Sequence, residues 1–247
     1  LLKIFFPGKL VFGNGTLPQL VNDVIELKPS KVFIATIEPL KNTLASFTEQ
    51  LQQNNIQVLV DTSIVAEPSF ADFEKLMQLV TPFNPDAVIG IGGGSVLDIA
   101  KLVAAQLENE QQLKDYVGIG LLKGRKKKLI CVPATSGTGS EVSPNAILVD
   151  DENQKKGIIS PYLVPDIVYV DPLLTVSVPP SITAATGLDA LTHCLEAYTN
   201  KFSQPFIDMY AYEGMRLIAA HIETAVKEGS NMVRIGSLLF GERNYTK

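Results

Sequence analysis

Asp189 and His193 stand four residues apart in the segment Gly187-Leu-Asp-Ala-Leu-Thr-His193. Residues at i and i+4 lie on one face of an α-helix, so this spacing offers a carboxylate and an imidazole to one divalent cation. A stable metal centre takes three or four protein ligands, so the pair supplies half of such a site. The alternative is a solvated, hydrogen-bonded pair on a helix surface. The rest of the sequence has to decide between the two.

A glycine turn, Gly92-Gly-Gly-Ser95, directly follows an apolar run and precedes a helical pattern. In a strand–turn–helix arrangement, backbone N–H groups and the positive end of the helix dipole face an anion, and glycines let the backbone approach a pyrophosphate. We expect Ser95 to cap the helix and to donate to phosphate. The turn matches neither GxGxxG nor the P-loop, and the alternative is a tight turn without a ligand. Its place at the end of a central strand favours phosphate binding.

Two further features are candidates for the same site as this turn. Asp98 and Lys101 follow in the same helix; the helix dipole gives Asp98 a structural alternative, and Lys101 either reaches the crevice or forms a surface pair. A second loop, residues 133–141, has four hydroxyl side chains and two glycines after another apolar run. Alone, this loop could be an ordinary turn. Two such loops at the ends of two strands of one sheet predict a shared dinucleotide.

The elements that must position these residues alternate between strands and helices. Strands are predicted over residues 31–36, 57–60, 87–91, 129–132, 146–149 and 167–170, and helices over 40–54, 70–80 and 95–107. Short apolar strands between amphipathic helices predict an α/β fold, a Rossmann-like parallel sheet covered on both faces. After Pro179-Pro180 only helical patterns follow, over 181–199, 204–227 and 231–240. We therefore predict a dinucleotide-binding domain over 1–179 and a partial, all-helical metal and substrate domain over 180–247.

The composition of the chain argues against several classes of function. With 21 basic and 26 acidic residues the net charge is −5, which argues against nucleic acid as a partner. The basic run at 125–128 is interpreted as a solvated turn. Two cysteines, Cys131 and Cys194, are too few for a disulfide framework and are expected to be buried free thiols. No apolar run reaches membrane-spanning length and no signal peptide is visible, so we expect a cytoplasmic protein without membrane contact.

Three motifs in order, Gly92–Lys101, Pro133–Glu141 and Ala185–His193, carry a resemblance to the iron-containing (group III) alcohol dehydrogenases, which have a dehydroquinate synthase-like fold. The resemblance extends from about residue 6 to residue 241. It implies NAD or NADP as cofactor, Fe²⁺ as the usual metal with Zn²⁺ compatible with the same ligands, and a homo-oligomer, expected to be a dimer.

The resemblance also implies individual roles. It assigns Gly94 and Ser95 to the pyrophosphate, and Gly93 and Asp98 are included in the predicted cofactor site. The resemblance assigns Thr135, Thr138 and Ser143 to the phosphate and nicotinamide half of the cofactor. In the family, residues at the positions of Lys156 and Leu174 also contact the cofactor. Asp189 and His193 match the first two metal ligands, with Glu196 in a supporting or structural role.

Two departures from the family pattern matter. Many NAD-dependent members carry Asp after the Thr that ends the first strand, where it excludes a 2′-phosphate, whereas Thr36 is followed by Ile37 and Glu38. The remaining histidine, His221, matches neither of the family's two further metal-ligating histidines and is expected to lie on the surface or between helices. We expect a chain that is truncated or incompletely represented.

The resemblance implies hydride transfer between a nicotinamide and a primary alcohol or its aldehyde, with the metal as Lewis acid and no dedicated side-chain base. Two alternatives stay open: a non-catalytic dinucleotide-binding remnant without a complete metal site, and a different enzyme on the same fold, such as a glycerol-type dehydrogenase or a sugar-phosphate lyase-type enzyme. The identity of the alcohol is left open.

Overall fold

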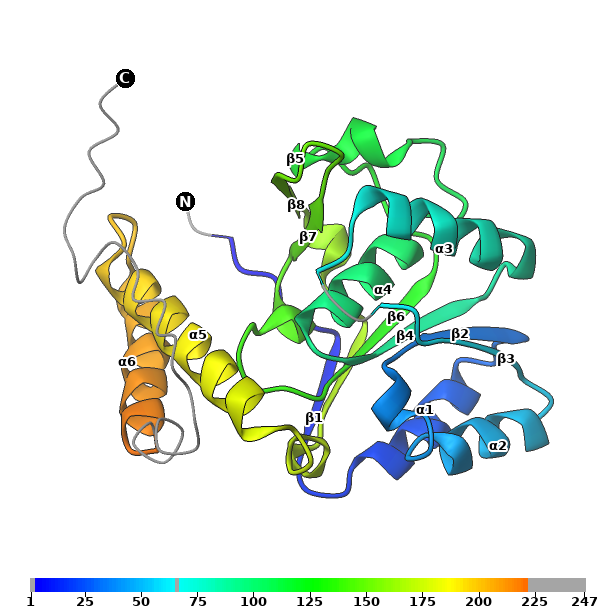
Figure 1. The fold of residues 1–247 in the computed structure, drawn as a ribbon, viewed down its shortest axis with the longest axis horizontal. Helices are drawn as coiled ribbons and strands as arrows, with labels where there is room; N and C mark the ends of the chain where they lie inside the picture. The colour runs from blue at the N-terminus through cyan, green and yellow to red at the C-terminus, as the bar shows by residue number, and fades with distance from the viewer. Residues whose placement is uncertain (1–2, 65–66, 222–247) are drawn as a thin grey trace. The chain divides into compact units, whose positions relative to one another are not determined.

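The computed structural model describes residues 3–64 and 67–221 (Figure 1). The chain divides into two compact units, each of which is treated by itself below. The first contains the chain up to Ala134 together with Ser140–Leu174, and the second contains Thr135–Gly139 together with the chain from Thr175 onward. The sequence-based boundary at 179/180 lies shortly after the break at Leu174, and the assignment of Thr135–Gly139 to the second unit was not anticipated.

The first unit is organised around a six-stranded parallel sheet. The strand order is β1-β9-β6-β4-β2-β3. The strands are β1 (Lys9–Phe12), β2 (Lys31–Ala35), β3 (Gln57–Asp61), β4 (Ala87–Gly92), β6 (Lys128–Pro133) and β9 (Ile167–Val170). From β2 the chain adds β3 on one side and then β4 on the other, so the order reverses between β2 and β4. Open α/β sheets bind ligands beyond the carboxyl ends of strands at such a switch point.

Helices cover both faces of this sheet, as predicted. They are α1 (Leu20–Glu26), α2 (Ala45–Gln53), α3 (Phe70–Phe83) and α4 (Gly94–Gln106). Successive strand residues point to opposite faces, so Phe33 and Val88 pack with α3 and α4, whereas Ile34 and Ile89 pack with α1 and α2. Helix α3 begins with a capping box between Ser69 and Asp72. Six short 3₁₀ helices complete the described chain at Leu17–Gln19, Glu38–Leu40, Leu113–Tyr116, Ser140–Val142, Pro161–Leu163 and Pro172–Thr175.

A second, three-stranded sheet corrects one expectation. Its order is β5-β8-β7, with β5 (Gly118–Ile119), β7 (Asn145–Val149) and β8 (Lys155–Ile159). The strand predicted at 146–149 therefore pairs antiparallel with β8 and does not join the parallel sheet. Strands β1, β5 and β8 were not predicted, because β5 is two residues long and both β1 and β8 begin with lysines. The helix predicted over 40–54 begins only at Ala45, after a 3₁₀ turn.

The part of the second unit that the structure describes is built on two helices, α5 (Pro180–Thr199) and α6 (Pro205–Ala219). Each begins at a proline, which suits the first helical position because that residue's N–H has no helical partner. The helices pack closely at Gly214, where a Cβ atom would lie 2.6 Å from Cys194 Sγ. The predicted helix at 204–227 ends at Ala219 within the described chain; its last residues and the helix predicted at 231–240 lie outside the described residues.

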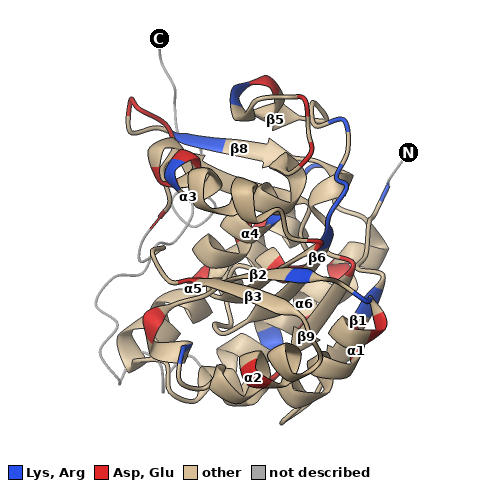
Figure 2. Cartoon of the chain, turned by 90° about the vertical axis from the view of Figure 1, so that its right-hand side faces the viewer, with Lys and Arg blue, Asp and Glu red and all other residues tan. Residues whose placement is uncertain are grey.

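Charges are interspersed over the molecule (Figure 2). The basic run expected to be a solvated turn is largely engaged within the fold. The Arg125 guanidinium donates to Asp166 at 2.6 Å, and Lys127 Nζ pairs with Glu108 at 2.6 Å.

Both cysteines are free; Cys131 is fully buried, but Cys194 is only half-buried. None of the described helices is long and apolar enough to cross a membrane.

Asp171 ties the end of β9 to the beginning of the chain. Its carboxylate accepts the backbone N–H groups of Gly15 (2.9 Å), Leu17 (3.0 Å) and Leu173 (3.1 Å). Burial acts to raise the pKa of Asp171, but these backbone hydrogen bonds outweigh burial and lower it. The ionised carboxylate therefore stabilises the fold.

We predict that Asp171→Ala lowers the free energy of unfolding by about 2–4 kcal/mol at neutral pH, because several buried N–H groups lose their acceptor. The pKa is lower in the folded than in the unfolded protein, so this contribution is complete above the ordinary carboxyl value of 3.8 and is lost as the pH falls through the folded value. Denaturant unfolding of both proteins at pH 7 and pH 3 should show the difference narrowing. A difference that stays constant would contradict this role.

Candidate cofactor site and metal half-site

The glycine turn lies at the switch point, directly between β4 and α4. Gly93 is the N-cap residue of α4, with φ −76° and ψ 179°, and Ser95 is already the second residue of the helix. The prediction that Ser95 caps the helix is therefore wrong. Because Gly93 has no side chain, no cap covers the first N–H groups of α4, and they remain available to an anion.

The same turn depends on unusually close packing between α4 and β4. A Cβ atom at Gly90 would lie 2.7 Å from the Cβ of Ala100, and one at Gly92 would lie 2.9 Å from the Cβ of Val96. Real Cβ atoms essentially never come so close, so both positions require glycine. The two glycines thus set the height of the helix above the sheet and the place where its N terminus emerges.

The carboxyl end of β2 forms the other side of the switch point. Thr36 is buried and donates its hydroxyl to the Ile91 carbonyl at 2.8 Å, which joins the ends of β2 and β4. Ile37 is partly buried, and Glu38 is exposed. The Glu38 carboxylate accepts from Thr62 Oγ1 at 2.8 Å and lies 3.4 Å from Lys41 Nζ. Thr62 is the main cause of a lowered pKa at Glu38, so its negative charge is held at the end of the strand.

The loop with hydroxyl side chains follows β6. In the first unit, Ala134 donates its N–H to the Gly92 carbonyl at 2.8 Å, and Ser140 is buried. Between them, Thr135 and Thr138 belong to the second unit. Within that unit, a Cβ on Gly137 would lie 2.7 Å from the Thr186 Cβ in α5, so the loop backbone requires glycine there. Gly139 has φ +64°, a left-handed conformation that favours glycine.

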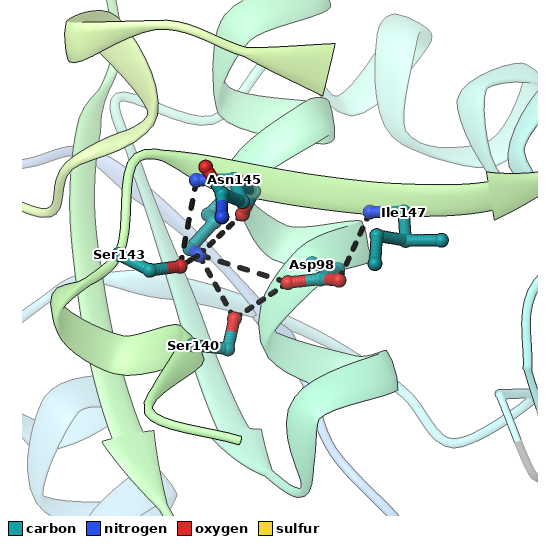
Figure 3. A network of polar contacts seen from close by, with 6 residues as sticks. Asp98, Ser140, Ser143, Asn145 and Ile147 are labelled. Carbon is teal, nitrogen blue, oxygen red and sulfur yellow. Dashed lines mark hydrogen bonds and ion pairs between the residues drawn. The ribbon is translucent and has the colours of Figure 1, made fainter. Parts of the chain in front are cut away.

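Asp98 and Ser143 were predicted to contact the cofactor, and both face a buried polar network (Figure 3). Asp98 accepts from Ser140 Oγ at 2.5 Å and from the Ile147 N–H at 3.0 Å. Ser143 Oγ accepts from Lys101 Nζ at 3.3 Å. Neither alternative for Lys101 holds, because its side chain is 0% exposed and lies inside this network, neither reaching an open crevice nor forming a surface pair.

Lys156 and Leu174 occupy different surroundings. Lys156 lies in β8 of the small sheet, and its ammonium contacts Asp150 Oδ2 and Gln154 Oε1, both at 3.0 Å. Leu174 is buried in the 3₁₀ helix Pro172–Thr175. Their roles in cofactor binding therefore remain predictions.

Asp189 and His193 lie on one face of α5, as their spacing predicts. Their side chains are 47% and 53% exposed, and His193 Nδ1 is 3.9 Å from Asp189 Oδ2. Within 3–64 and 67–221, the structure places no group of three or more His, Cys, Asp or Glu side chains where they could hold a metal. Glu196 and His221 are exposed. The described residues therefore provide two donors on one helix turn, half the number that a metal site takes.

Sequence models of known families match both units. The model described as iron-containing alcohol dehydrogenase matches residues 7–172, and the carboxyl-terminal model of the same family matches residues 183–242. The chain belongs to the iron-containing alcohol dehydrogenase family. The resemblance carried by the three sequence motifs is thereby confirmed.

Relatives of this iron-containing alcohol dehydrogenase family member are similar over most of its length. Long-chain-alcohol dehydrogenase 1 of Geobacillus thermodenitrificans is 39% identical over 93% of this chain and 59% of its own length. Sulfoacetaldehyde reductase of Bilophila wadsworthia is 34% identical, over 94% of this chain and 61% of its own. The chain thus spans about three-fifths of the length of these relatives.

Solved structures agree on the fold. A structure described as 1,3-propanediol oxidoreductase has a TM-score of 0.85 at 29% identity and covers 94% of this chain and 61% of its own. Sulfoacetaldehyde reductase of Bifidobacterium kashiwanohense, solved in complex with NAD⁺, has a TM-score of 0.81 at 27% identity and covers 94% of this chain and 62% of its own.

We predict that Zn²⁺ or Fe²⁺ binds only weakly to the two donors found among the described residues, because they leave most coordination positions to water. Metal content after dialysis against a mild chelator should be well below one ion per chain. Asp189→Ala or His193→Ala should abolish what remains in a Zn²⁺ titration, and His221→Ala is the matched control that should leave it unchanged. One metal ion per chain surviving dialysis would show that further ligands complete the site.

Proposed function

We propose that this protein acts in NAD(P)-dependent alcohol oxidation or aldehyde reduction, as its family's name describes. The observation that carries the proposal is the glycine turn at the switch point of the parallel sheet, in a chain that matches the family over both units. Relatives named for different substrates, a long-chain alcohol and sulfoacetaldehyde, leave the substrate at the level of an alcohol–aldehyde pair.

The residues at the switch point fit a dinucleotide. Gly93 and Gly94 allow a pyrophosphate to approach the backbone, and the uncapped N terminus of α4 supplies N–H donors and a positive dipole end. Ser95, in the first turn, adds a hydroxyl donor. Thr135 and Thr138 are proposed donors for the nicotinamide half of the cofactor. Asp98 and Ser143 would act on the cofactor indirectly, through the buried polar network to which both belong. The bound nicotinamide would supply the hydride chemistry.

The described residues do not form a complete metal site, so no step is assigned to a metal here. Asp189 and His193 are proposed as two of its ligands, with the remainder supplied from outside the described residues. The same observation favours a second candidate function, a dinucleotide-binding protein without metal-dependent turnover. Activity of the purified chain with added Fe²⁺ or Zn²⁺ distinguishes the two.

We also propose that the protein is cytoplasmic and forms a homo-oligomer, expected to be a dimer.

We predict that Gly93→Val weakens NADH binding by roughly ten- to a hundredfold, the loss expected when hydrogen bonds to a charged group are removed. The backbone of Gly93 is extended, so valine is compatible with the conformation, and its side chain would occupy the space proposed for the phosphate. Fluorescence titration measures the affinity. Gly124→Val is the control, since a Cβ there meets nothing within 4 Å. Equal affinities of wild type and Gly93→Val would remove the phosphate-site assignment.

We predict weak discrimination between NADH and NADPH, because Ile37 stands where a carboxylate would meet the ribose. Glu38 supplies the remaining negative charge, held by Thr62. Glu38→Ala should therefore improve NADPH affinity relative to NADH by about fivefold, as expected for removing one solvated charge near a phosphate. Parallel titrations with both cofactors measure the ratio, and Glu49→Ala on α2 serves as an exposed control. A strong NADH preference that survives Glu38→Ala would place the selectivity elsewhere.

A further inference from the structure

Lys101 lies fully buried in the second turn of α4, where burying a charge costs free energy. Its ammonium has three donors, and three acceptors surround it: the Asn145 carbonyl at 2.7 Å, Ser140 Oγ at 2.8 Å and Ser143 Oγ at 3.3 Å (Figure 3). Asp98 Oδ1 lies 3.6 Å from Lys101 Nζ. The charged form is therefore satisfied by the segment that follows residue 139.

The hydroxyl of Ser140 connects Lys101 to Asp98 in this network. Ser140 accepts from Lys101 and donates to Asp98, whose second oxygen accepts the Ile147 N–H. Burial lowers the pKa of Lys101 and raises that of Asp98, while each partner's charge opposes the shift of the other. Cys131 in β6 and Glu141 are the other titratable groups that act on Lys101. A buried ion pair is weak grounds for stability, because well-packed apolar residues often do as well.

The position of the network suggests what else it does. Ser140 is the residue at which the chain re-enters the first unit after Thr135–Gly139. At the other end of that five-residue stretch, Ala134 is fixed to β4 through the Gly92 carbonyl. The two residues that flank this stretch, Ala134 and Ser140, are thus both held within the first unit, one by a backbone hydrogen bond to β4 and the other by Lys101 and Asp98 of α4.

We propose that Lys101 is a positioning residue for cofactor binding: its ammonium fixes Ser140 and the residues that follow it to the helix whose N terminus receives the pyrophosphate. This inference rests on the proposed dinucleotide-binding function. It assigns to Lys101 no contact with the cofactor. Without the ammonium the segment that begins at Ser140 is released from α4, and only a fraction of molecules hold this segment and the glycine turn ready for the ligand.

The test uses the full chain and the variant Lys101→Met, which keeps the side-chain length and removes the charge. If release of the loop reduces the binding-competent population to about a tenth, the apparent Kd for NADH rises about tenfold. Amide hydrogen exchange without cofactor should become faster in residues 135–147 and stay unchanged in β2 and β3. Lys127→Met is the matched control, because Lys127 is also buried and ion-paired but precedes β6, at the opposite end of the sheet.

Weaker NADH binding and faster loop exchange in Lys101→Met alone would support the proposal. Equal binding by wild type and Lys101→Met, or equal losses in Lys101→Met and Lys127→Met, would overturn it, since the lysine would then act only through general stability. If Lys101→Met does not fold, Ser140→Ala removes one acceptor of Lys101 and the donor to Asp98, and the same two measurements decide. Absence of NADH binding by the wild type would overturn the proposed function itself, and this inference with it.

Discussion

Helix α4 lies so close to β4 that Gly90 and Gly92 leave no room for a Cβ atom against Ala100 and Val96. This steric constraint determines where the helix N terminus emerges from the sheet. It therefore determines where Gly93 and Gly94 present their backbone to a ligand. The strand order reverses between β2 and β4 at that same edge, which is where open α/β sheets bind ligands. The proposed cofactor site is thus a consequence of packing in the core, before any side chain contacts a ligand.

The polar interior of the first unit serves the same arrangement. Thr36 joins the ends of β2 and β4, and Asp171 joins the end of β9 to the chain before α1. The Lys101 network fixes the chain after residue 139 to α4. Each of these buried groups is satisfied, and each connects segments that are far apart in sequence. Such connections preorganise loops at the sheet edge, which lowers the cost of ordering them when a ligand binds.

Sequence reasoning succeeded where a pattern was local and strong. The apolar runs of β4 and β6 and the glycine turn predicted the central strands and the turn between β4 and α4, and prolines predicted the beginning of α5. It failed where tertiary contacts decide. Ser95 looked like a cap, but the helix begins one residue earlier at a glycine. The sequence predicts a crevice or surface position for Lys101, whereas its side chain is fully buried between the apolar, buried neighbours Ala100 and Leu102. That setting, with Asp98 three residues before it, was the available signal for a buried ion pair.

The central claim is that the N terminus of α4 receives the cofactor's pyrophosphate. The most direct measurement is an NMR titration of the isotope-labelled chain with NADH, following backbone amide shifts. We expect the largest changes at the amides of Gly93, Gly94 and Ser95, with smaller changes at Glu38 beyond the end of β2. Saturable binding with no change at these three amides, and the largest changes elsewhere, would contradict it.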